Sequence, residues 1–163
     1  MTEARDIDMR PDPTLRPPAG AGIPHPRAFG IALHTGDRGL SRTVEHVSNT
    51  EYVRWIDRAA ELHADALGHS RAAMAELGHM WFVARHEIDY RAEAFPGEEL
   101  HVFTWVRSIA GPVSWRDTVV LRPGDGRLVC AAATRWAWVN LASRRPVRVP
   151  DAVRDSLDPM ERR

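Results

Sequence analysis

The apolar residues of this chain change their spacing once, near residue 78, and that change constrains the fold. Between residues 52 and 66 they recur every three to four positions, which is the spacing of one buried helix face. Between residues 80 and 90 apolar and polar residues alternate, as they do along a strand. The chain therefore has to pack one long helix against several strands.

Turn signals divide the region after the helix into four strands. They lie at residues 94–98, 111–112 and 123–126, and the last is typical of a tight hairpin. A short apolar run at residues 29–34 predicts one more strand before the helix. This order predicts an α+β fold, in which an antiparallel sheet packs against one long helix.

The predicted helix has a recognisable start and end. Ser48 and Glu51 match the S-x-x-E capping box, in which the Ser side chain and the Glu side chain each accept a backbone amide. Gly68 supplies the end. The first amides of a helix have no partner inside it, and the helix dipole makes this terminus positive. Such a terminus favours a phosphate or the oxyanion of an acyl-transfer intermediate.

The chain length of 163 residues predicts one folded domain with a segment at each end. Residues 1–28 hold six prolines and few apolar side chains, which predicts a flexible arm. That arm is either a passive tail or a cover over a neighbouring subunit. Residues 29–150 are predicted to form the folded domain, and residues 151–163 a short C-terminal helix and tail.

Composition argues against several kinds of function. The 22 basic and 22 acidic residues balance, which argues against nucleic acid or an anionic membrane as a partner. All the basic residues are Arg, so a Schiff-base or P-loop lysine is excluded. The one cysteine, Cys130, cannot form an internal disulfide, which suits the cytoplasm. No run reaches the roughly 20 apolar residues of a membrane span, and the histidine spacing predicts no metal site.

The segment that begins at His46, H-V-S-N-T-E-Y-V-R-W, resembles a motif of a known family. It is similar to the H-V-N-N-x-x-Y-L-x-W segment of hotdog-fold acyl-CoA thioesterases of the 4-hydroxybenzoyl-CoA thioesterase family. The order of predicted elements over residues 29–150 is also similar to the hotdog fold, in which an antiparallel sheet wraps around one long helix. The resemblance implies an acyl-CoA or acyl-carrier-protein thioester as substrate. It implies no cofactor other than the coenzyme A of that substrate.

The same resemblance implies a homodimer or homotetramer, because hotdog domains of this family have their sites at subunit interfaces. Physical reasoning agrees, since one sheet and one helix leave apolar surface uncovered. Asn49 occupies the first-turn position whose backbone amide, in the resembled family, polarises the thioester carbonyl.

One position departs from the family pattern. Ten residues before Tyr52 the family usually has an acidic nucleophile or general base, and this chain has Arg42. A guanidinium stays protonated and can do neither. Glu45 and His46 are the predicted replacements, because both precede the helix and either could take a proton from water. Glu51 is within reach but is predicted to be occupied by the capping box.

Arg42 and Tyr52 are predicted to contact the substrate, Arg42 through a carboxylate or phosphate. Two functions stay open. The first is a cytoplasmic acyl thioester hydrolase with weak or narrow activity. The second is a non-hydrolytic hotdog protein that binds acyl thioesters, or a biosynthetic enzyme acting on a carrier-bound intermediate. Arg42 favours the second. No sequence feature indicates the acyl group.

Overall fold

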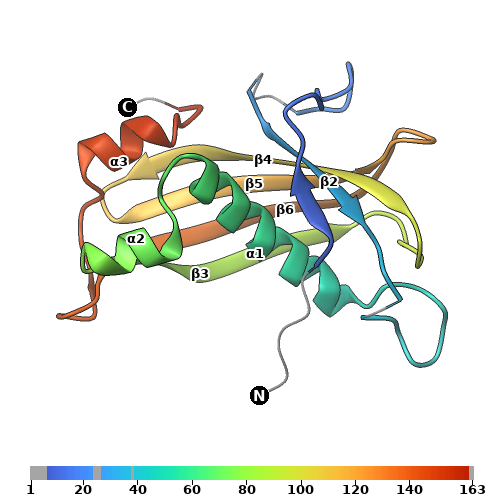
Figure 1. The fold of residues 1–163 in the computed structure, drawn as a ribbon, viewed down its shortest axis with the longest axis horizontal. Helices are drawn as coiled ribbons and strands as arrows, with labels where there is room; N and C mark the ends of the chain where they lie inside the picture. Colours follow the sequence, from blue (N-terminus) through green and yellow to red (C-terminus); the bar gives the residue numbers. More distant parts are fainter. Residues whose placement is uncertain (1–6, 24–26, 38, 162–163) are drawn as a thin grey trace.

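A computed structural model describes residues 7–23, 27–37 and 39–161, in which one antiparallel sheet curls around the long helix α1 (Asn49–Ala66) (Figure 1). The strands run in the order β1-β2-β4-β5-β6-β3, and β7 pairs with β6. This arrangement confirms the predicted α+β class. The strands are β1 (Met9–Pro11), β2 (Phe29–His34), β3 (His79–Tyr90), β4 (Glu99–Ala110), β5 (Val113–Arg122), β6 (Arg127–Asn140) and β7 (Arg145–Pro146).

Helix α1 forms because its apolar side chains share one face, and that face covers the sheet. Trp55, Ile56 and Ala59 are buried against residues such as Val102 of β4 and Val129 of β6. The helix ends where the sequence predicts. Its C-cap is Leu67, and the next residue, Gly68, has a φ of +78°.

A second apolar cluster closes the other end of the sheet. It brings together the short helices α2 (Arg71–Glu76) and α3 (Asp151–Ser156) with β4 and β6. Helix α3 begins at Asp151, where the sequence predicts the C-terminal helix. The buried members of the cluster are Met74, Val106, Ile109, Trp138, Val149 and Leu157.

The N-terminal segment is more firmly attached than its proline content predicts. Its residues 9–11 form β1 and pair with β2. The chain then crosses β2 so closely that a Cβ on Gly30 would lie 2.9 Å from the Cβ of Leu15. Leu15 and Ile23 pack on the outer face of the sheet, over Phe103 and Trp105. The expectation of a flexible arm is wrong for these residues, because a few apolar side chains are enough to anchor it. Residues 1–6 and 24–26 lie outside the described part.

Strand β3 is the long open edge of the sheet. Along the sheet, β3 pairs with β6 on one side only, and more than half of its residues are exposed. Phe82 and Val83 are 43% and 40% exposed there. Across the described residues, no helix has the length and apolar character needed to cross a membrane.

Candidate functional site

The N-terminus of α1 is capped by Ser48, as predicted, but the capping box does not form. The Ser48 hydroxyl accepts the Thr50 amide at 3.4 Å. The Ser48 amide donates to the Gly39 carbonyl at 2.6 Å, so it is not available to Glu51. The Glu51 carboxylate instead accepts two hydrogen bonds from Arg54, at 3.0 and 2.9 Å. The predicted reciprocal bond is therefore wrong, and an ion pair one turn along the helix replaces it.

The loop before α1 is held by backbone hydrogen bonds and by Tyr52. Val47 donates its amide to the carbonyl of Ala94 at 2.8 Å. The Tyr52 hydroxyl accepts the Ala94 amide at 3.0 Å and donates to the Ala92 carbonyl at 3.4 Å. Tyr52 is 3% exposed, and burial raises the pKa of its phenol. The Tyr52 hydroxyl thus braces this loop, and the predicted substrate contact of Tyr52 stays a prediction.

Asn49 is the first residue of α1 and is exposed. Its carbonyl accepts a hydrogen bond from the Tyr90 hydroxyl at 3.2 Å, which ties the helix start to β3. Among the described residues, no hydrogen bond from the Asn49 backbone amide is found. That amide is therefore a donor at the positive end of the helix, as the sequence predicts.

Arg42, Glu45 and His46 lie together on the bend that leads into α1. Arg42 and Glu45 are exposed, and neither forms an ion pair with another described residue. His46 is half-buried, and its Nδ1 atom is fully buried without a hydrogen-bond partner in the described chain. All three precede Asn49 by three to seven positions in the sequence, and among them His46 has a buried nitrogen without a hydrogen-bond partner in the described chain.

A cavity of about 250 Å³ opens beside the first turn of α1. Its lining includes Glu51, Arg54 and His34. Gly39 lies against the Glu51 carboxylate, because a Cβ on Gly39 would be 2.5 Å from Glu51 Oε2. None of the five residues predicted for the site lines this cavity. The sequence placed Glu51 within reach but assigned it to the capping box, and so missed its place in the cavity wall.

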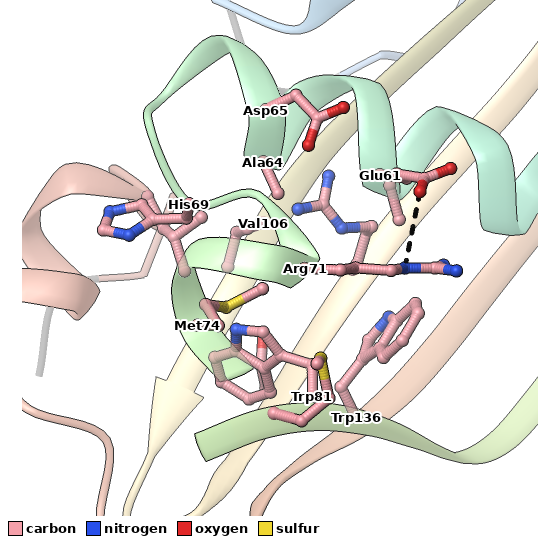
Figure 2. A pocket seen from close by; sticks show the side chains of 14 residues that line it. Glu61, Ala64, Asp65, His69, Arg71, Met74, Trp81, Val106 and Trp136 are labelled. Atoms are coloured by element: carbon pink, nitrogen blue, oxygen red, sulfur yellow. Dashed lines mark ion pairs between the residues drawn. The ribbon is translucent and has the colours of Figure 1, made fainter. Parts of the chain in front are cut away.

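A second cavity lies at the far end of α1, between α1, α2 and the sheet (Figure 2). We call it the arginine cavity, because Arg116 of β5 lines it while being only 6% exposed. This cavity was not predicted from the sequence. Ser114, Arg116 and Thr118 occupy alternate positions of β5 and so share one face of the strand. Polar residues at that spacing favour a solvent-facing position, yet all three are buried. The full lining is Ala60, Glu61, Ala64, Asp65, His69, Arg71, Met74, Met80, Trp81, Val106, Ser114, Arg116, Trp136 and Leu157.

The sequence over residues 6–157 matches the thioesterase-like superfamily. The chain belongs to this superfamily. Thioesterase-like proteins that it resembles include the chloroplastic acyl-[acyl-carrier-protein] hydrolase FATB3 of Cuphea viscosissima, with 25% identity over 153 residues. That match covers 92% of this chain and 37% of the plant protein. The chain therefore spans little more than a third of the length of that curated relative.

Solved thioesterase structures share the fold. A putative oleoyl thioesterase from Lactobacillus plantarum aligns with a TM-score of 0.76 and 17% identity, over 81% of this chain and 51% of that one. A 1,4-dihydroxy-2-naphthoyl-CoA thioesterase from Synechocystis aligns with a TM-score of 0.72 and 15% identity, over 80% of this chain and 95% of that one. This thioesterase-like chain thus has the hotdog fold that the sequence predicts.

Within the described residues of the thioesterase-like chain, no three His, Cys, Asp or Glu side chains gather as a metal site would need. Cys130 is buried in β6, and burial raises the pKa of its thiol to about 12. At neutral pH it is a protonated thiol rather than a nucleophile. The chemistry available at the α1 terminus is therefore that of backbone amides, carboxylates and imidazole.

Proposed function

We propose that this protein hydrolyses acyl thioesters, with the thioester carbonyl oxygen bound at the Asn49 amide. The observation that carries the proposal is the exposed start of α1, where this amide has no partner among the described residues. An amide at a helix N-terminus stabilises the negative charge that develops on oxygen when water attacks a carbonyl. Membership of the thioesterase-like superfamily supports the same chemistry.

The proposed base is Glu45 or His46. The base takes a proton from water while the water oxygen attacks the carbonyl carbon. The carbon–sulfur bond then breaks, and the thiolate leaves and takes up a proton. Both residues lie on the loop that enters α1, three and four positions before Asn49. Glu51 is a weaker candidate, because Arg54 holds both of its carboxylate oxygens.

The proposed substrate is carried by coenzyme A or by acyl carrier protein. The names of two relatives support both carriers, one being an acyl-carrier-protein hydrolase and the other a coenzyme A thioesterase. Arg42 is exposed on the same loop and would meet a phosphate or carboxylate of the carrier. No resident cofactor is needed, and coenzyme A enters only as part of the substrate. We further propose a cytoplasmic homodimer or homotetramer.

A non-hydrolytic function is the second candidate, and Arg42 is the observation that favours it. A protein with the same helix terminus but without the family acid could bind acyl thioesters without cleaving them. It could equally act on a carrier-bound biosynthetic intermediate.

The test is a panel of acyl-CoA and acyl-carrier-protein esters, with release of free thiol as the readout. On any ester that is cleaved, Glu45→Gln, His46→Ala and Glu51→Gln are compared with Glu76→Gln, an exposed carboxylate on α2. We expect a loss of about 10²-fold or more for Glu45→Gln or His46→Ala, as for other general bases, and none for Glu76→Gln. Arg42→Asp completes the set. A rise in turnover for Arg42→Asp, with no change in the other variants, would replace hydrolysis with the binding function.

A further inference from the structure

Arg116 is a buried cation, and among the described residues it has no carboxylate as an ion-pair partner. Its guanidinium makes two hydrogen bonds, both from Nη1, to Nδ1 of His63 at 2.9 Å and to Oγ1 of Thr104 at 3.2 Å. No carboxylate of the described chain lies within ion-pair distance of it. Burial lowers the pKa of Arg116 to about 10, which leaves it charged at neutral pH.

Neither of its two partners supplies a negative charge. A guanidinium only donates, so His63 accepts through Nδ1 and is neutral in this arrangement. Thr104 in turn donates to the Asp117 carbonyl at 3.0 Å and lies 3.0 Å from the Thr118 hydroxyl. Uncharged acceptors under α1 therefore accept the hydrogen bonds of Nη1, but they do not balance the charge of the guanidinium. Nε and Nη2 of Arg116 make no hydrogen bond to a described residue, but they are not among the fully buried unpartnered atoms, so they reach the solvent of the cavity.

The same cavity is lined by one fully buried donor that has no partner in the described chain, the Nε1 atom of Trp136. An indole, like a guanidinium, donates and never accepts. Trp136 of β6 pairs in register with Ser114 of β5, and Ser114 lies two positions before Arg116 on that strand. The cavity therefore combines donors from β5 and β6 that need an acceptor.

The other walls of the cavity are mostly apolar. Figure 2 shows Met74, Trp81 and Trp136 around the same space below α1. Glu61 is paired with Arg58 at 2.6 Å and lies 3.7 Å from Arg71. The charge of Asp65 also acts on Arg71 and raises the pKa of the Arg71 guanidinium. The two acidic side chains of the lining, Glu61 and Asp65, thus interact with Arg58 and Arg71 rather than with Arg116.

The buried charge of Arg116 lacks a counter-charge within ion-pair distance in the described chain, and Trp136 Nε1 is a buried donor without an acceptor there; both are costly. One ligand would remove both costs: a carboxylate offers two acceptor oxygens and a negative charge, and its apolar body suits the rest of the wall. We infer that the arginine cavity binds a small organic carboxylate, with the carboxylate on Arg116 and Trp136 and the alkyl part against Met74 and Trp81.

The cavity is small, at about 50 Å³, so the part of the ligand that enters is short. Met74 and Met80 can change conformation more easily than branched side chains, which allows some expansion. The site is separate from the proposed thioester site. His63, which contacts Arg116, lies about 20 Å along α1 from Asn49 at the rise of an α-helix.

The experiment measures binding of hexanoate and of 1-hexanol to the full chain by calorimetry at neutral pH. Hexanol has the same alkyl body without the charge. We expect hexanoate to bind and hexanol to bind at least about tenfold more weakly, because a charged hydrogen-bonded contact contributes more than a factor of ten. Arg116→Leu should weaken hexanoate about tenfold or more and leave hexanol unchanged. Trp136→Phe keeps a ring but removes the donor, and should weaken hexanoate several-fold.

Arg135→Leu is the matched control, because Arg135 is an exposed arginine of β6 next to Trp136, and it should change neither ligand. The inference is overturned if hexanoate does not bind at tens of millimolar, or if hexanol binds equally well. It is also overturned if Arg116→Leu folds and still binds hexanoate as the wild type does. If Arg116→Leu does not fold, an unchanged hexanoate affinity in Trp136→Phe overturns it. None of these readouts depends on thioester hydrolysis.

Discussion

His63 of α1 accepts a hydrogen bond from Arg116 of β5 over 2.9 Å, in the interface where the helix covers the sheet. The ring of His63 is also stacked on Phe29 of β2, with centroids 4.9 Å apart. A ring stack on β2 and a hydrogen bond to β5 thus join α1 to two strands. Because a hydrogen bond is directional, it fixes the position of the helix along the sheet as well as its distance from it.

Removing His63 should destabilise the protein through Arg116. In His63→Leu, a buried donor loses its acceptor, which costs about 1–3 kcal/mol of unfolding free energy. In the background of Arg116→Leu, the same change should cost clearly less, because the donor is gone. Urea denaturation of the four proteins measures both. Additive effects of the two changes would show that the contact contributes nothing to stability.

Gly39→Ala should lower stability more than Gly97→Ala. Both glycines have a positive φ, +68° and +77°, so alanine is strained at either position by about 1–2 kcal/mol. At Gly39 the new Cβ would also meet the Glu51 carboxylate, whereas at Gly97 nothing lies within 4 Å. The difference between the two melting temperatures isolates the contact with Glu51. Equal losses would mean that the loop moves away from α1 without cost.

Ser48→Ala should cost about 0.5–2 kcal/mol of unfolding free energy, because the Thr50 amide loses its acceptor. Ser48→Asp keeps an acceptor at the cap and should retain the stability of the wild type. If hydrolysis is detected, Ser48→Ala should also slow it, since the amides of the first turn lose their positioning. An unchanged melting temperature for Ser48→Ala would show that this cap is not needed to start α1.

His86 should make stability depend on pH. Burial lowers the pKa of His86, against the opposing charge of Asp57, so the folded protein binds this proton less tightly than the unfolded chain does. Unfolding free energy should therefore fall as the pH drops below about 6.5, and the loss should be complete below the folded-state pKa. His86→Gln can keep the bond to Thr134 and should flatten this part of the curve. Superimposable curves for the two proteins would remove His86 from the explanation.

The open edge of β3 should form the subunit contact. Phe82→Glu should shift the protein toward monomer, because a charge would be buried in that contact. Phe95→Glu changes an equally exposed phenylalanine, 42% against 43%, on a loop, and should not alter the assembly. Light scattering at micromolar concentration separates the two results. A wild type that is already monomeric would contradict the proposed dimer or tetramer.

Elements with a long, regular pattern could be predicted from the sequence. The helix at residues 49–66 and the strands at residues 79–140 lie within three residues of the expected bounds, because their periodicity reports a buried face directly. Strands β1 and β7 were not predicted. They have three and two residues, too few to show a period, and both end in proline.

The site was less predictable, because polar residues on a strand usually face solvent and here several of them are buried. On β5 the polar set of Ser114, Arg116 and Thr118 faces the helix, and no local pattern distinguishes that from facing water. Glu51 was considered, but two uses compete for it, and only tertiary structure shows that Arg54 prevails. The unbonded amide of Asn49 was predictable because the first amides of a helix have no partner inside it, whereas the role of Asn49 in the site stays a prediction.

The two ends of the sheet are unequal, and this limits how copies of the chain can join. One end is β1, three residues long and closed by Pro11, which cannot donate to a further strand. The other is β3, twelve residues long. A filament grows when the edge strand at one end of the sheet pairs with the opposite edge strand of the next copy. Here β1 is too short for such pairing. Joining like to like at β3 uses up, on both copies, the only long edge that the described residues offer, so growth by strand addition stops at a closed pair.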